Sequence, residues 1–206
     1  MSEQVIVKKA FQVNKICEKC GLHQYSAYPK IQGRGVLSKA TDLVLIGEAP
    51  GLTESKKNKV FCGRAGSKLE ELLTPLKKLN AKIYITNAVK CYPPMSTMFP
   101  EKAFRVPKQS EMELCRTYLE EELKETNSNH VVLMPLGVTA LKAVTQQTGE
   151  KISSIASELG VMRKVKIGRR TFSVLPNYHP SFILRNPHMA IHFNKVIDSY
   201  IKWCLS

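Results

Sequence analysis

The stretch Asp42-Leu43-Val44-Leu45-Ile46-Gly47-Glu48-Ala49-Pro50-Gly51 is the most informative in the chain. Its apolar run is short and uninterrupted, which is typical of a buried strand in a parallel sheet. The run leads directly into the carboxylate of Glu48 instead of an ordinary polar turn. Open parallel sheets bind ligands at the carboxyl ends of their strands, so this motif is predicted to lie at a ligand crevice.

Three further short apolar runs have the same character. They span Lys82 to Ile85, His130 to Met134 and Phe172 to Leu175, and segments with helical periodicity separate them. Strands that alternate with helices are typical of an α/β fold with a central parallel sheet. We therefore predict an α/β fold whose parallel sheet contains these three runs and the run before Glu48.

Four helices are expected between and after these strands. Ser67 and Ser110 are each followed three residues later by glutamate, a capping box that marks a helix start. A third helix is expected after Gly137, and a fourth from about His188 to Leu205. The charged segment from Lys151 to Arg170 has weak periodicity and is expected to be an insertion.

The composition favours one basic, intracellular domain that spans residues 1–206. The chain carries 31 Lys and Arg against 17 Asp and Glu, a net charge of +14, which favours an extended polyanion as partner over a merely solvated basic surface. No apolar stretch approaches the length of a membrane span, and the N-terminus lacks the pattern of a signal peptide. We expect a cytoplasmic protein without a membrane partner.

Polar residues follow three of the predicted strands. Glu48, Asn87 and His179 each stand just beyond an apolar run, so the parallel sheet is expected to bring them to one edge. His179 precedes Pro180, which favours an extended backbone that presents the imidazole to the crevice. The convergence of the three motifs, more than any one of them, predicts a functional site.

Asn87 and Phe61 each have a functional and a structural interpretation. An amide offers a donor beside an acceptor, which matches N3–H and O4 of uracil or thymine; the ordinary alternative for Asn87 is a helix cap or a turn. Phe61 lies between Val60 and Cys62 in a loop before a helix. It is either a platform on which a base stacks or a core residue.

The cysteine spacing predicts a metal centre. Cys17 and Cys20 form a Cys-x-x-Cys pair, and Cys91 and Cys115 follow later in the chain. Four thiolates suit either zinc or an iron-sulfur cluster, and spacing alone leaves both open. Unrelated buried thiols are a further alternative, as is a redox dithiol at the Cys-x-x-Cys pair, although that pair precedes the first predicted strand instead of opening a helix after one.

Four segments together resemble the family 4 uracil-DNA glycosylases, the iron-sulfur members of the uracil-DNA glycosylase superfamily. They are Gly47 to Gly51, Phe61 to Gly66, Thr86 to Cys91 and His179 to Pro187, in the order of the family. With the cysteines, the resemblance covers the chain from Cys17 to about Pro187.

The resemblance implies a three-layer α/β/α sandwich around a four-stranded parallel sheet, and a [4Fe-4S] cluster in preference to zinc. It also implies that the N-terminal segment 1–40 packs onto the domain through the cluster. The ligands it implies are Cys17, Cys20, Cys91 and Cys115.

The activity implied is that of a monofunctional glycosylase, which flips uracil out of DNA and hydrolyses its N-glycosidic bond to leave an abasic site. His179 would stabilise charge on uracil O2, while Glu48 or Glu54 would handle the water or the sugar cation. Leu184 and Arg185 would enter the minor groove or fill the gap left by the base. The resemblance further implies that Gly47, Ala49, Gly51, Phe61 and Asn87 bind uracil, with Ser181 joining Leu184 and Arg185 against DNA.

Two other interpretations remain open at this level. One is a catalytically inactive module that binds DNA or attends replication; the other is a zinc-containing DNA-binding protein. Ser55, Asn58 and Val60 depart from the family's usual Asp, Gly and Pro, and the segment from Tyr92 to Lys108 is longer than usual, an extra contact surface or a tolerated loop. We expect a monomer whose partner is uracil-containing DNA, with a replication or repair protein as a possible second partner.

Overall fold

The computed structural model describes residues 17–98, 100, 103–145, 152 and 154–205. The first 16 residues of the N-terminal segment 1–40, and parts of both predicted insertions, lie outside the described residues. No helix within the described ranges has both the length and the hydropathy needed to cross a membrane.

A six-stranded sheet forms the centre of the molecule, with strand order β1-β3-β2-β4-β6-β5. The four inner strands β3, β2, β4 and β6 run parallel, and β1 and β5 pair antiparallel at the two edges. The four predicted parallel strands are confirmed, but the sheet has six strands instead of four. The bounds are β1 (Arg34–Gly35), β2 (Leu43–Gly47), β3 (Ile83–Asn87), β4 (Val132–Pro135), β5 (Arg163–Ile167) and β6 (Arg170–Val174).

The two edge strands explain why the sequence predicts only four. β1 has two residues, too few for a periodic pattern. In β5 only Val165 and Ile167 are buried, and Lys164 and Lys166 are exposed, so an edge strand lies where we predicted an irregular insertion. Gly168, with a φ of 59°, makes the turn from β5 to β6.

In the described ranges, seven α-helices and two 3₁₀ turns surround the sheet. The helices expected after Gly137 and at the C-terminus are confirmed, whereas both capping boxes misplace a helix start. The helix near Ser67 begins at Arg64, after Gly63, and the helix near Ser110 begins at Gln109. The bounds are α1 (Leu52–Lys57), α2 (Arg64–Leu72), α3 (Thr74–Lys78), α4 (Gln109–Lys124), α5 (Val138–Thr145), α6 (Pro180–Arg185), α7 (Ala190–Leu205), η3 (Leu22–Tyr25) and η5 (Pro187–Met189).

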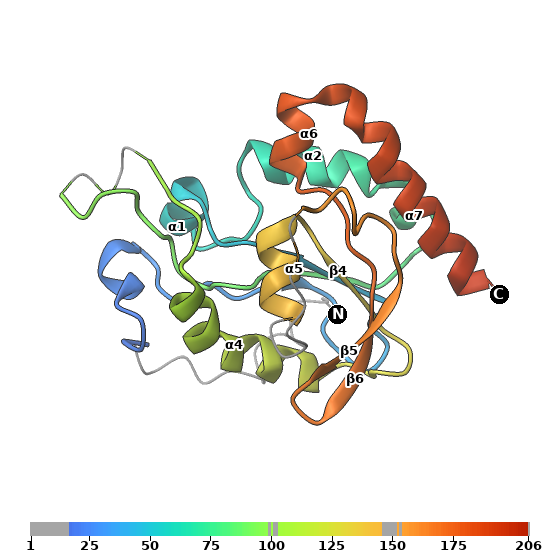
Figure 1. Ribbon diagram of the computed structural model, residues 1–206, viewed down its shortest axis with the longest axis horizontal. Helices are drawn as coiled ribbons and strands as arrows, with labels where there is room; N and C mark the ends of the chain where they lie inside the picture. Colours follow the sequence, from blue (N-terminus) through green and yellow to red (C-terminus); the bar gives the residue numbers. More distant parts are fainter. Residues whose placement is uncertain (1–16, 99, 101–102, 146–151, 153, 206) are drawn as a thin grey trace, which may run out of the picture.

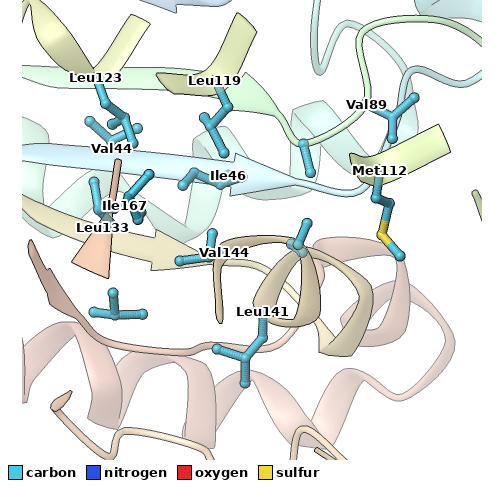
Figure 2. Packing of buried hydrophobic residues seen from close by; sticks show 14 of the residues in the cluster. Val44, Ile46, Val89, Met112, Leu119, Leu123, Leu133, Leu141, Val144 and Ile167 are labelled. Carbon is cyan, nitrogen blue, oxygen red and sulfur yellow. The ribbon is translucent and has the colours of Figure 1, made fainter. Parts of the chain in front are cut away.

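Helices cover both faces of the sheet, as a three-layer α/β/α sandwich requires (Figure 1). Side chains alternate along β2, so that Val44 and Ile46 enter one core and Leu43 and Leu45 the other. The first core packs against α4 and α5, and Figure 2 shows Leu119 and Leu123 of α4 pointing toward β2. The second core packs against α2, α3, α6 and α7. The sheet is therefore rigidly held, and the carboxyl ends of β2, β3 and β4 lie at one edge.

The insertion from residue 92 to residue 108 is a loop with hairpin-like bonding in its described part. Met95 N donates to Ala103 O over 2.8 Å, and Arg105 N donates to Pro93 O over 3.1 Å. The loop reaches out beside α1, at the left of Figure 1. It exposes the apolar side chains of Met95, Met98, Phe104 and Val106.

Candidate active site

Gly47, Asn87 and Phe61 meet at the carboxyl ends of β2 and β3. Gly47 and Asn87 are paired residues on the two neighbouring strands. A Cβ atom added to Gly47 would lie 2.3 Å from Asn87 Oδ1 and 2.6 Å from Phe61 Cζ, so only glycine fits between them. The Asn87 side chain is only 3% exposed, and no hydrogen bond within the described part of the chain engages its amide. The N–H donor and the carbonyl acceptor of the Asn87 amide are thus available beside the Phe61 ring.

Two contacts fix the main chain of the loop that carries Phe61, one with Gly66 and one with Glu54. Phe61 has a φ of 49°, and a Cβ on Gly66 would lie 1.8 Å from the Phe61 carbonyl oxygen, so the first turn of α2 packs directly on the loop backbone. Glu54 secures the same loop, because its Oε1 accepts a hydrogen bond from Gly63 N over 3.1 Å. Gly63 is the N-cap of α2, where a carboxylate also compensates the helix dipole. Phe61 is therefore both buried and part of the site.

His179 lies near Phe61, on the segment that leads from β6 to α6. Its ring centroid lies 5.8 Å from that of Phe61. It is the N-cap of α6, and its Nδ1 accepts the main-chain N–H of Ser181 over 3.2 Å, while the Ser181 hydroxyl lies 2.7 Å from the same nitrogen. Burial, with a smaller effect of Arg185, lowers the pKa of His179 to about 4. The imidazole is thus neutral at pH 7, with its proton on Nε2.

Glu48 follows β2 directly and is half-buried. Burial raises the pKa of its carboxyl group, and a hydrogen bond with the Thr139 side chain partly opposes that shift. The main chain around Glu48 is tied to β3, since Val89 N donates to Glu48 O over 3.0 Å. The carboxylate therefore sits in a sheltered place at the sheet edge, next to the first turn of α5.

Ser181, Leu184 and Arg185 lie on α6, the short helix that follows His179. Leu184 is 43% exposed and Arg185 is exposed, whereas Ser181 contacts the imidazole. The three residues therefore differ in their surroundings. Ser181 is hydrogen-bonded to His179, whereas Leu184 and Arg185 are exposed to solvent. Gly51 lies against the Glu54 carboxylate.

Three cysteines of the predicted cluster lie in one region of the core: Cys91 and Cys115 are buried there, and Cys20 packs against it. The thiol of Cys91 is within electrostatic range of Cys17 and Cys20, and that of Cys115 is within range of Cys20 and Cys91. Burial raises the pKa of Cys91 to about 11 and that of Cys115 to about 12. Buried thiols in such proximity suit metal binding, which converts them to thiolates.

Main-chain donors already point at two of these sulfurs. Lys30 N donates to Cys91 Sγ over 3.3 Å, and Lys90 N donates to Cys115 Sγ over 3.2 Å. Hydrogen bonds to sulfur are one way in which proteins tune iron-sulfur ligands. Among the residues that the structure describes, no group of three or more His, Cys, Asp or Glu side chains is arranged as a metal site, so the support for the cluster is the chemistry of the donors. The all-sulfur donor set and its N–H donors fit an iron-sulfur cluster.

The three departures from the family pattern have structural explanations. Ser55 is buried, and its Oγ accepts Ala27 N over 3.1 Å, which ties α1 to the cysteine-bearing segment. Asn58 ends α1 with a φ of 49°, a conformation that asparagine tolerates better than most residues. Val60 is fully buried in the core. These residues support the loop without displacing a site side chain.

Two residues of the site escaped the sequence analysis. Thr139 bonds Glu48, and Gly137, with a φ of 87°, brings β4 against the His179 loop, because a Cβ there would lie 3.3 Å from His179 Cβ. Gly137 stands directly between an apolar run and a helix, which was the available signal. Nothing comparable marks Thr139.

Comparisons with known proteins agree with this geometry. The family model of the uracil DNA glycosylase superfamily matches residues 34–202. The type-4 uracil-DNA glycosylase of Thermotoga maritima is 34% identical over 172 residues, covering 84% of this chain and 80% of that protein. The type-4 enzyme of Pyrobaculum aerophilum is 29% identical over 189 residues (92% and 90%), and that of Sulfurisphaera tokodaii is 30% identical over 174 residues (84% and 73%).

Proposed function

This chain belongs to the uracil DNA glycosylase superfamily, and from that membership and the site geometry we propose that it excises uracil from DNA and leaves an abasic site. The observation that carries the proposal is the meeting of Asn87, Phe61 and His179 around Gly47, in a place where only glycine fits.

Recognition of the base rests on Asn87 and Phe61. Uracil within a duplex is inaccessible, so the nucleotide must first be flipped into the site, at a cost of a few kcal/mol. Asn87 then accepts a hydrogen bond from N3–H and donates one to O4, whereas cytosine presents the opposite pattern at these atoms. The Phe61 ring stacks on the base. The backbone from Gly47 through Ala49 to Gly51 completes the pocket wall.

Cleavage of the glycosidic bond leaves positive charge on the sugar and negative charge on uracil O2. The neutral imidazole of His179 donates its Nε2–H to O2, and its low pKa favours this neutral form. The electron pair of the C1′–N1 bond departs with uracil, and water adds at C1′ while its proton passes to the Glu48 carboxylate. Catalysis uses no Schiff base, so no strand cleavage accompanies it.

Glu48, and not Glu54, is assigned to the sugar cation and the water. Glu48 is sheltered, lies beside the strand end, and has its carboxyl pKa raised by burial, which is typical of a carboxylate with a catalytic task. One oxygen of Glu54 is already engaged by Gly63 N, so we assign Glu54 to positioning the loop of Phe61.

A [4Fe-4S] cluster on Cys17, Cys20, Cys91 and Cys115 completes the proposed enzyme. Thiolate ligation at all four positions leaves no open coordination site, so we give the cluster a structural task and derive no catalytic step from it. With it the N-terminal segment 1–40 becomes part of one domain spanning residues 1–206. Main-chain hydrogen bonds from this segment to Lys90 and Cys91 support the arrangement.

DNA is the proposed macromolecular partner. We propose that α6 contacts its minor groove and that basic side chains contact its phosphates. The net charge of +14 supports it. We propose that the protein acts as an intracellular monomer. A replication or repair protein as a second partner remains a proposal for which the exposed apolar loop at residues 92–108 is the candidate surface.

The test is excision from labelled oligonucleotides that carry uracil opposite G, uracil opposite A, or uracil in a single strand, followed by alkaline cleavage of abasic sites. We expect scission with the wild type, and much less with Asn87→Ala or His179→Ala. Absence of scission with intact DNA binding would establish the inactive-module alternative. A brown preparation with broad absorbance near about 400 nm is expected for the cluster, and a colourless zinc-containing one would contradict it.

A further inference from the structure

Lys90 and Glu122 form a buried ion pair between the proposed cluster and the proposed uracil pocket. Lys90 Nζ lies 2.7 Å from Glu122 Oε2, and the two side chains are only 2% and 5% exposed. Lys90 is on the turn after β3, and Glu122 is on α4, about two helical turns beyond Cys115. Nothing in the proposed reaction touches either group.

The carboxylate of Glu122 accepts hydrogen bonds from two side chains of β3, the strand that carries Asn87. Tyr84 OH donates to Glu122 Oε1 over 3.1 Å, and Thr86 Oγ1 donates to Glu122 Oε2 over 2.9 Å. Lys90 Nζ also donates to Thr86 Oγ1 over 2.6 Å. Side chains alternate along a strand, so Tyr84 and Thr86 face α4 while Asn87 faces the pocket. The network therefore holds the back of β3 directly behind Asn87.

The main chain of Lys90 holds the cysteine-bearing segments. Its N–H donates to Cys115 Sγ over 3.2 Å, and its carbonyl oxygen accepts Ile31 N over 2.9 Å. The next residue is Cys91, whose sulfur accepts Lys30 N. One residue thus joins the N-terminal segment, the start of α4 and the end of β3.

We propose that the Lys90–Glu122 pair is a positioning device that sets Asn87 relative to the cluster, so that the cluster ligands and the uracil-reading amide move as one unit. The proposal rests on the proposed function. Asn87 has little room for error, because its Oδ1 lies 2.3 Å from where a Cβ on Gly47 would be. A buried ion pair is an inefficient source of stability compared with apolar residues of similar volume, which favours a role in geometry.

The variant K90M/E122Q tests the device, because it removes both charges and keeps an amide that can bond Tyr84 and Thr86. E120Q is the matched control: it removes a carboxylate from the same helix, where Glu120 pairs with Arg116 at the surface. The variants are compared as purified holoproteins by iron content, melting temperature, DNA affinity, single-turnover excision, inhibition by free uracil and the half-time of iron release to a chelator.

We expect the double variant to fold, bind DNA like the wild type, and purify with its iron. Single-turnover excision should fall about tenfold to a hundredfold, as expected for a small misplacement at a reactive site, and free uracil should inhibit correspondingly less. Iron release should be several-fold faster. The control should match the wild type in every measurement. A purely structural role would lower the melting temperature without weakening uracil inhibition in the loaded protein.

Unchanged excision, uracil inhibition and iron release in K90M/E122Q overturn the proposal. If that variant does not fold, Y84F/T86V takes its place, since it removes both hydroxyls through which Glu122 holds β3. Wild-type excision and uracil inhibition by this variant would overturn the proposal equally. A wild type that excises no uracil overturns the proposed function instead, while iron release from the variants still reports on the coupling between the pair and the cluster.

Discussion

The Nδ1 atom of His179 lies 2.7 Å from the Ser181 hydroxyl and accepts the Ser181 N–H over 3.2 Å, so both groups hold the imidazole in one tautomer. The proton is left on Nε2, which has no partner within the described ranges, and the ring centroid lies 5.8 Å from that of Phe61. The imidazole of His179 is thereby fixed as a neutral hydrogen-bond donor.

The pH dependence of excision follows from this tautomer. His179 has its pKa lowered to about 4, so it stays neutral as the pH rises from about 5.5 to 8, and the single-turnover rate should show no transition at the ordinary histidine pKa of about 6.5. A decrease of the rate at low pH, where it appears, is assigned to protonation of Glu48, whose pKa is raised by burial. His179→Ala should lower the rate about a hundredfold or more. A rate that falls steeply from pH 6 to pH 7.5 would indicate a cationic His179.

The two carboxylates should respond differently to amide substitution. Glu48→Gln should lower single-turnover excision about a hundredfold, because it removes the negative charge assigned to the sugar cation and the water. Glu54→Gln should cost only a few-fold, since its amide oxygen still accepts the hydrogen bond from Gly63 N. The two variants serve as each other's control, with DNA affinity measured for both. The reverse order of effects would assign the catalytic role to Glu54.

Gly47→Ala should damage recognition without unfolding the protein. The new Cβ would lie 2.3 Å from Asn87 Oδ1 and 2.6 Å from Phe61 Cζ, so both side chains must shift. We expect excision to fall about a hundredfold while DNA affinity is retained. Wild-type excision by this variant would mean that Asn87 does not read the base from its observed position.

The exposed lysines at and just after the end of α1 should contact DNA phosphates. Lys56, Lys57 and Lys59 lie between the Glu48 motif and Phe61 in the chain, and all three are exposed. Changing them to Gln should reduce the slope of log K against log salt for duplex DNA by about 0.9 for each phosphate that is no longer neutralised.

The matched control for that triple variant changes Lys82, Lys124 and Lys202 to Gln. These lysines are also exposed; Lys82 directly precedes β3 and Lys124 ends α4, away from the carboxyl ends of the strands. The control alters net charge equally and should leave the salt slope nearly unchanged. Equal slopes for the two triple variants would mean that the lysines act only through the overall charge.

Leu184 should matter more on duplex than on single-stranded substrate. It is 43% exposed on α6 beside His179, in a place to fill the gap that a flipped base leaves in the stack. Leu184→Ala should slow duplex excision several-fold more than single-strand excision, and Arg185→Ala should weaken duplex binding. Leu79→Ala, at an exposed leucine that follows α3, is the control. An equal effect of Leu184→Ala on both substrates would contradict the assignment.

The local order of residues was sufficient to predict the parallel strands and the edge of the sheet at which Glu48, Asn87 and His179 lie, whereas the four-cysteine metal centre stays a prediction. Short apolar runs specify buried strands, and strands in parallel deliver their carboxyl ends to the same edge, so the chain's own pattern carries this information. The capping-box pattern predicted the wrong helix starts at Ser67 and Ser110. A serine three residues before a glutamate is as compatible with a helix interior as with a helix start. The edge strand β5 was missed because only two apolar residues, Val165 and Ile167, mark its buried face, too few for a clear signal within a charged segment.

The tautomer of His179, the different surroundings of Glu48 and Glu54, the supporting roles of Ser55 and Thr139, and the burial of Lys90 against Glu122 could not be read from the pattern. Each depends on contacts between segments distant in the chain, such as Lys90 with Glu122 or Ala27 with Ser55. Sequence periodicity reports which side of an element is buried, but not which polar group it meets there. The protonation and exact placement of a reactive side chain are set by those partners, so they became visible only once the chain was folded.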